Sequence, residues 1–159
     1  MSMSLSTSMS MCSGFARVCC FWKKSSSRYE DASWKTTVPY VPDVKEGKVI
    51  KVYDGDTITV AAFVPGCKTM YRFSVRLDGI DTPEMKTKNE EEKLLAHKAQ
   101  EDLSGKVLGE MVELENVSME KYGRLLATVV HKGVNMNQWM IDQGHAKEYH
   151  GGTKSHFVP

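Results

Sequence analysis

The sequence predicts an α+β fold that is mainly β, a five-stranded Greek-key barrel of the oligonucleotide-binding type (OB-fold) with two helices. Short runs rich in β-branched residues are separated by Asp-Gly and Pro-Gly turns. One long helix signal stands between the third and fourth runs, and a shorter one follows the fifth. This order fits a small barrel better than an alternating strand and helix scheme, which would give a parallel sheet.

Composition and charge are those of one domain with an N-terminal extension. We divide the 159 residues into an arm, 1–40, and a folded domain, 41–159. The formal net charge is only +1. A grip on nucleic acid would therefore have to come from a local patch of basic side chains rather than from the whole chain.

The arm is rich in Ser, Met and Cys and is expected to be disordered when free. Three interpretations stay open for it. It is a featureless tail, an organelle transit peptide, or a membrane anchor S-acylated at Cys19 and Cys20 beside an aromatic and dibasic stretch. No run approaches the roughly 20 apolar residues of a membrane-spanning helix. The location is therefore either at a membrane through the acylated arm, cytoplasmic, or in an organelle.

The first three strands are predicted at 48–53, 57–64 and 71–78. In the third strand the apolar side chains take every odd position, and one face should be buried. The predicted inward residues are Tyr71, Phe73, Val75 and Leu77. The alternation turns Arg72 and Arg76 to the opposite face.

The long helix should begin after Asn89, which forms a capping-box pair with Glu92. Leu95, Ala99 and Leu103 repeat every four residues and predict its buried stripe, and Gly105 or Gly109 ends it. Strands follow at 111–117 and 124–131. A second helix is predicted over 135–143, with Trp139 and Met140 facing inward and Gly144 as its C-terminal cap.

Acids and one arginine gather on two turn-and-strand segments, Asp54-Gly55-Asp56-Thr57 and 75–84. A phosphodiester repels an attacking hydroxide, and its transition state carries still more negative charge, so cations must converge on it. Asp56 and Asp81 offer the hard oxygen ligands that Ca²⁺ accepts. Arg76 offers a planar fork for phosphate oxygens. The combination indicates a metal-assisted phosphodiesterase.

Four segments together are similar to the staphylococcal nuclease (thermonuclease-like) family over roughly residues 47–149. They are Asp54 to Thr57, Arg76 to Glu84, Lys121 to Ala127, and Gln143 to Ala146. The resemblance implies a calcium-dependent endonuclease that cleaves DNA and RNA and leaves 3′-phosphates. As partners we expect DNA or RNA, single strands above all, and we expect the protein to be a monomer.

The resemblance also implies roles for single residues. Asp56, Asp81 and the backbone carbonyl of Thr82 would be the calcium ligands. Arg76 and Arg124 would clamp the scissile phosphate, and Glu84 would orient or deprotonate the attacking water. Three further residues would bind the nucleotide: Lys121 and Tyr122 at its terminal phosphate and base, and Tyr149, or His150 one residue later, by stacking on the base.

The acidic stretch 90–92 would repel nucleic acid on its own side of the domain. We therefore expect the substrate to approach past four lysines, which are Lys86, Lys88, Lys121 and Lys147.

Each motif also has a purely structural interpretation. Asp54-Gly55 suits a type I′ hairpin turn without any metal. Arg76 could pair with Asp78, and Arg124 with Glu120. The alternative function is a catalytically inactive OB-fold module that binds nucleic acid or protein. Such modules typically lose the acids or an arginine, and this chain retains all six of the implied metal-binding and catalytic residues.

Overall fold

The computed structural model describes residues 29–152 and 157. The chain divides into two units between Pro39 and Tyr40. Within residues 29–39 a short turn is held by the Thr36 hydroxyl, which donates to the Asp31 carbonyl at 2.6 Å. Cys19 and Cys20, the predicted acylation sites, lie outside the described residues. Among the helices that are described, none has the length and apolar character needed to cross a bilayer.

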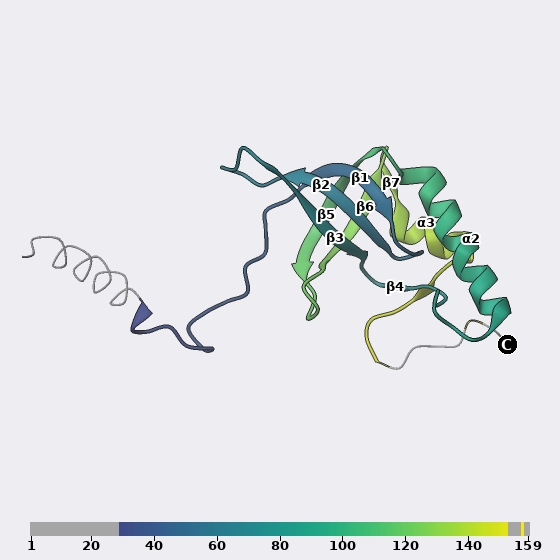
Figure 1. The fold of residues 1–159 in the computed structure, drawn as a ribbon, viewed down its shortest axis with the longest axis horizontal. Coiled ribbons are helices and arrows are strands. Elements are labelled where there is room, and N and C mark those ends of the chain that lie inside the picture. The colour runs from purple at the N-terminus through teal and green to yellow at the C-terminus, as the bar shows by residue number, and fades with distance from the viewer. Residues whose placement is uncertain (1–28, 153–156, 158–159) are drawn as a thin grey trace, which may run out of the picture. The chain divides into compact units, whose positions relative to one another are not determined.

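The second unit contains the predicted five-stranded barrel, which the structure confirms (Figure 1). Its strands are β1 (Glu46–Val52), β2 (Thr57–Phe63), β3 (Met70–Leu77), β5 (Met111–Met119) and β6 (Leu125–His131). Neighbours pair in the order β3-β2-β1-β5-β6, and a parallel pairing of β3 with β6 closes the ring. Every pairing except β3–β6 is antiparallel, as a Greek-key barrel requires.

The barrel interior is filled by aliphatic side chains that alternate along the strands. The fully buried ones include Val49, Ile58, Val60, Val75, Leu77 and Leu125. The prediction that Tyr71 is buried is wrong, because its side chain is 45% exposed. Tyr71 lies near the tip of the β2–β3 hairpin, which extends beyond the barrel in Figure 1, so no opposing strand covers it there.

Three two-residue strands complete the sheet structure: β4 (Ile80–Asp81), β7 (Val134–Asn135) and β8 (Lys147–Glu148). β7 extends the edge of β6. β4 pairs antiparallel with β8, which places Asp81 opposite Lys147. Strands this short leave no periodic pattern in the sequence, and they were not predicted.

Helix α2 (Glu90–Val107) begins where predicted, since the Asn89 side chain accepts hydrogen bonds from the backbone N–H groups of Glu91 and Glu92. It ends before Gly109, whose φ of 81° is strained for any residue with a side chain. The buried stripe is Ala96, Ala99, Leu103 and Val107. The prediction of a buried Leu95 is wrong, because the stripe passes through Ala96 and leaves Leu95 44% exposed.

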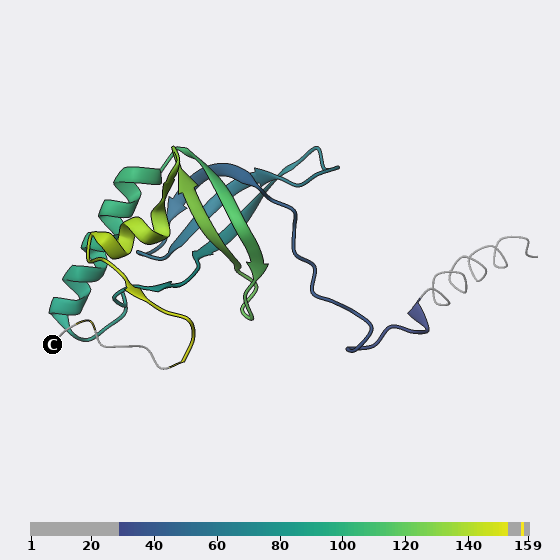
Figure 2. The ribbon, with the colours of Figure 1, turned by 180° about the vertical axis from the view of Figure 1, so that it is seen from behind.

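Helix α3 (Met136–Asp142) is capped by Asn135 and stops before Gly144, close to the predicted bounds. Met140 is buried and Trp139 is half-buried against the core. The two views in Figures 1 and 2 place α3 beside α2 at one end of the barrel. The buried amide of Asn137 fastens α3 to the strands, because it donates to the Asp78 carbonyl at 2.7 Å and accepts from the Val129 N–H at 3.0 Å.

Candidate functional site

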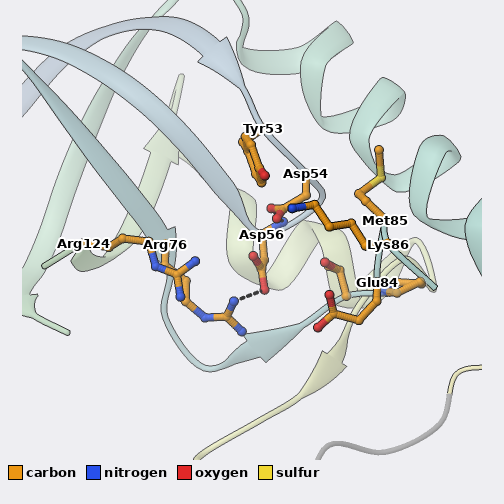
Figure 3. Close-up of a pocket in the computed structure, with 10 residues that line it drawn as sticks. Tyr53, Asp54, Asp56, Arg76, Glu84, Met85, Lys86 and Arg124 are labelled. Carbon is orange, nitrogen blue, oxygen red and sulfur yellow. Dashed lines mark hydrogen bonds and ion pairs between the residues drawn. The ribbon is translucent and has the colours of Figure 1, made fainter. Parts of the chain in front are cut away.

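A polar cleft of about 250 Å³ opens at the end of the barrel where the β1–β2 turn, the end of β3 and the start of β6 meet the segment after β4. Figure 3 shows these residues converging from the different elements. The lining residues are Tyr53, Asp54, Asp56, Arg76, Thr82, Pro83, Glu84, Met85, Lys86 and Arg124. Five of the six residues to which the sequence assigned metal binding or catalysis therefore share this cleft. The sixth, Asp81, reaches it through Arg76.

The β1–β2 turn places Asp56 at the bottom of the cleft. Gly55 allows this placement because the turn packs tightly: a Cβ at this position would lie 3.0 Å from Ala99 of α2 and 3.0 Å from Thr82. The backbone N–H of Asp56 donates to the Asp54 carboxylate at 3.2 Å. The tight turn leaves the Asp56 side chain only 4% exposed.

Arg76 joins two buried carboxylates. Its Nη1 lies 2.5 Å from Oδ2 of Asp56, and its Nη2 lies 3.3 Å from Oδ1 of Asp81. The three side chains are 12%, 4% and 3% exposed, in the order Arg76, Asp56, Asp81. The guanidinium also donates to the Ile80 carbonyl at 3.2 Å. Arg76 thus bridges the acids, in place of the solvated pair with Asp78 considered above.

Burial raises the pKa of the Asp56 carboxyl to about 7, and the negative charge of Asp54 acts in the same direction. The Arg76 guanidinium and the Thr57 hydroxyl, which donates to Asp56 at 2.8 Å, lower this pKa but do not outweigh the burial. Near neutral pH the single arginine therefore does not fully stabilise the Asp56 carboxylate. Additional positive charge in the cleft would favour the ionised form.

Arg124 enters the cleft from the start of β6. Glu120 holds it with two hydrogen bonds, from Nε at 2.7 Å and from Nη2 at 3.1 Å. The third guanidinium nitrogen, Nη1, donates to the Thr57 hydroxyl at 3.4 Å. The paired charges lower the pKa of Glu120 and raise that of Arg124. Sequence reasoning considered the Glu120 pair only as an alternative to a catalytic role. In the structure Arg124 forms this pair with Glu120 and also lines the cleft.

Glu84 faces the cleft from the segment that follows β4, on the side away from Arg124 (Figure 3). Glu92 of α2 ties this segment to the helix: its carboxylate accepts from the Thr87 hydroxyl at 2.7 Å and from the Glu84 N–H at 3.5 Å. The prediction that Glu92 completes a capping box with Asn89 is wrong, because the Asn89 N–H donates to the Thr87 hydroxyl at 3.2 Å and the Glu92 carboxylate binds Thr87 and Glu84 instead. These hydrogen bonds join the segment after β4 to α2, and sequence patterns do not show which residues of two such segments meet.

The oxygen atoms of Asp56 and Thr82, which line the cleft, and of Asp81, which contacts Arg76, are of the kind that a hard divalent cation binds. Asp56, Asp81 and Thr82 are 3%, 2% and 5% exposed, and carboxylate and carbonyl oxygens are the ligands that Ca²⁺ and Mg²⁺ prefer. Within residues 29–152 and 157, no group of three or more His, Cys, Asp or Glu side chains is placed to hold a metal ion. The set implied by the resemblance has two carboxylates, with a backbone carbonyl as the third protein ligand.

The three predicted nucleotide-binding residues lie outside this cleft. Lys121 and Tyr122 are exposed on the β5–β6 turn, where the Lys121 ammonium lies 4.9 Å from the Tyr122 ring centroid. Tyr149 and His150 line a neighbouring cavity of about 350 Å³ that shares Arg76 with the cleft. The Tyr149 hydroxyl donates to the Gly152 carbonyl at 2.9 Å. Of the four lysines expected along the approach, Lys86 is the one that lines the cleft.

Comparison with known proteins identifies the family to which the chain belongs. A family model described as staphylococcal nuclease homologue matches residues 74–157, which include the second half of β3, Glu84, Arg124 and β8. Two relatives from Escherichia coli, one of them from strain O157:H7, are called uncharacterized endonucleases. Each is 31% identical over 104 residues, covering 65% of this chain and 60% of its own length. An uncharacterized protein of Methanocaldococcus jannaschii is 28% identical over 157 residues, covering 81% of this chain and 73% of its own. Because the family model covers more than half of the sequence, the chain belongs to the staphylococcal nuclease homologue family.

Proposed function

We propose that the protein is a calcium-dependent endonuclease that hydrolyses phosphodiester bonds in DNA and RNA with little sequence specificity and leaves 3′-phosphates. The observation that carries this proposal is the cleft itself, in which Arg76 bridges two buried carboxylates beside Arg124 and Glu84. Burying so much charge costs folding free energy, and clusters of buried charges in clefts are common at functional sites. Family membership and the endonuclease names of the two bacterial relatives support the endonuclease part of this proposal.

The two arginines bind the scissile phosphate in this proposal. Both line the cleft, and a guanidinium can donate two parallel hydrogen bonds to phosphate oxygens. Their fixed positive charge opposes the negative charge that accumulates on the equatorial oxygens in the transition state. Glu120 orients Arg124 through its two hydrogen bonds, so that Nη1 points toward Thr57 and Asp56.

Glu84 activates the water. It faces the cleft from the side away from Arg124, so a water beside it can attack phosphorus in line with the departing 5′-oxygen. A bond forms between the water oxygen and phosphorus while the bond from phosphorus to the 5′-oxygen breaks. Glu84 takes the water proton, and the leaving 5′-oxygen receives a proton from solvent. The products are a 3′-phosphate and a 5′-hydroxyl.

Asp56, Asp81 and the Thr82 carbonyl would hold the Ca²⁺ ion. A bound calcium ion supplies positive charge next to the phosphate and lowers the pKa of water. Calcium binding would be linked to the protonation of Asp56, because this carboxyl has a raised pKa and would have to lose its proton to hold the ion.

The test is cleavage of single-stranded DNA and RNA by the full chain, with Ca²⁺ and with a chelator, beside the Glu84→Gln variant. We expect calcium-dependent cutting that Glu84→Gln reduces by at least about 100-fold. End-group analysis should find 3′-phosphates. A folded protein that binds the strand without cutting it in any divalent ion would instead identify a nucleic-acid-binding module.

Membrane association through acylated Cys19 and Cys20 is a separate proposal that rests on the sequence of the arm alone. Metabolic labelling with palmitate should be lost when Cys12, Cys19 and Cys20 are all replaced by Ser. Unchanged labelling of the triple variant would remove this anchor.

A further inference from the structure

The outer face of strands β1, β2 and β3 carries basic side chains that the cleft does not use. Paired residues of neighbouring antiparallel strands point to the same side of a sheet. Lys48 of β1 pairs with Ala61 of β2, and Ala61 pairs with Arg72 of β3. Lys48 and Arg72 are both exposed, so this row faces solvent.

The next row brings a third basic residue to the same face. Lys51 pairs with Thr59, and Thr59 with Ser74. Strict alternation from Lys48 would turn Lys51 into the barrel. A β-bulge between Val49 and Lys51 inserts one extra residue, Ile50, and restores the outward direction of Lys51. Val49 and Val52 keep their inward positions, with 0% and 7% exposure.

These two rows of paired residues are followed, along β1 and β3, by residues that line the cleft. After Ser74, the next outward residue of β3 is Arg76, which pairs with Thr57 and binds Asp56. On β1, the Lys51 ammonium lies 5.6 Å from the ring centroid of Tyr53, and Tyr53 lines the cleft. The ring is half-exposed, at 51%. The acid on this face, Glu46, stands at the end of β1 that is farther from the cleft.

We infer that this face is a binding track for single-stranded nucleic acid, along which Lys48, Lys51 and Arg72 contact backbone phosphates and Tyr53 stacks on a base beside the cleavage site. The inference rests on the proposed function, since it takes the ligand of the cleft to be a nucleic acid. Lys48, Lys51 and Arg72 would then form the local basic patch that a chain of net charge +1 needs in order to bind a polyanion.

The dimensions of the face suit one strand. Arg72 and Arg76 are four residues apart on β3, about 13 Å at the usual rise of a strand, and β1 lies about 10 Å from β3. A single strand can follow a twisted sheet face and present a base to Tyr53, whereas the bases of a duplex stay stacked on each other. Barrels of this type bind about 4 to 16 nucleotides, so the track and the cleft would share one site.

The experiment measures binding of an oligothymidylate of about 16 nucleotides by fluorescence anisotropy at several salt concentrations, with a chelator present to prevent cleavage. Lys48→Gln, Lys51→Gln and Arg72→Gln are made singly in the full chain. Each should weaken binding and lower the slope of log K against log salt by about 0.7, the value for one phosphate contact on a single strand. Tyr53→Leu should weaken binding by roughly 5- to 150-fold, the range for a lost base stack.

Lys98→Gln is the matched control, because Lys98 is an exposed lysine on α2, away from this face. Its slope and affinity should equal those of the unaltered protein. Unchanged slopes in all three track variants would overturn the inference. So would a duplex of the same length that binds as tightly as the single strand and is weakened equally by the three substitutions. Because binding is measured without cleavage, an unaltered protein that binds but never cuts contradicts the proposed function and leaves the track standing.

Discussion

Two groups of charges, which are joined through Arg72 and Arg76 of strand β3, differ in their exposure to solvent. In the cleft, Asp56, Asp81 and Arg76 are almost fully buried, whereas Arg72 and Lys48 on the outer face of β1–β3 are exposed. Burial makes each charge costly and each contact strong, while water and salt weaken the exposed charges. The cleft should therefore respond to mutation with large changes in both stability and catalysis, and the outer face with small changes that depend on salt.

Arg76→Ala should have the largest effect. Removing the cation that Asp56 and Asp81 share should reduce kcat/KM by roughly 10²- to 10³-fold and lower the free energy of unfolding by about 3–5 kcal/mol at pH 8. The loss of stability should shrink toward pH 5, because the raised pKa of Asp56 lets this carboxyl take up a proton there. The measurements are cleavage kinetics and urea unfolding at both pH values.

The matched control for this variant is Arg72→Ala, since Arg72 stands four residues earlier on the same face of β3. Its free energy of unfolding should change by no more than about 0.5 kcal/mol. Equal losses of stability in the two variants would contradict the difference between buried and exposed charges.

Arg124→Ala should separate catalysis from stability. Cleavage should fall by roughly 10²- to 10³-fold, because the phosphate loses one of its two arginine contacts. Its ion pair with Glu120 is partly exposed, at 30% and 20%, so the free energy of unfolding should change by less than about 1 kcal/mol. Kinetics and thermal unfolding of the same preparation test this. A variant that cleaves within threefold of the unaltered rate, roughly 0.7 kcal/mol of barrier, has no role at the transition state.

The pH dependence of stability should reflect Asp56. Because burial raises its pKa in the fold from 3.8 to about 7, the folded protein binds more protons than the unfolded chain between these values. Without a divalent cation, the contribution of Asp56 should therefore make the fold less stable as pH rises from about 4 to about 7. Added Ca²⁺ should raise Tm more at pH 8 than at pH 5. Differential scanning calorimetry measures both effects, and an equal shift at the two pH values would contradict a site that includes Asp56.

Glu120→Gln should have the smallest effect. Arg124 keeps its charge but loses a charged partner that holds it by two hydrogen bonds. The free energy of unfolding should fall by less than about 1 kcal/mol, and cleavage should fall less than in Arg124→Ala. A loss of activity as large as that of Arg124→Ala would show that orientation, rather than charge, is what Arg124 contributes.

Local patterns predicted most of the fold. The inward positions of Val75 and Leu77 in β3, the Asn89 cap and the helix end before Gly109 each depend on residues adjacent in sequence, and the structure confirms them. The misses involve contacts between distant segments. Leu95 and Ala96 both fit a helical repeat, and only the packing of α2 on the barrel selects Ala96. Tyr71 follows the strand alternation but lies near the tip of the β2–β3 hairpin, where no other strand covers its side chain.

The candidate site could be predicted only in part. The resemblance identified the acids and arginines, but periodicity alone could not bring Asp56, Arg76 and Arg124 into one cleft, because that depends on the closure of β3 against β6. Residue periodicity also did not predict the bulge that turns Lys51 outward or the hydrogen bonds of Glu92. A bulge breaks the alternation on which strand prediction depends.

The most direct measurement is calcium binding by titration calorimetry, together with calcium-dependent cleavage, for the unaltered chain and for Asp56→Asn. The account predicts that the unaltered protein binds Ca²⁺ and releases protons near pH 7, because Asp56 is then partly protonated. It predicts that Asp56→Asn loses this binding and cleaves at least about 100-fold more slowly. An Asp56→Asn variant that cleaves at the unaltered rate in Ca²⁺ would contradict the account, since cleavage would then not need the carboxylate that lines the cleft and is assigned to calcium.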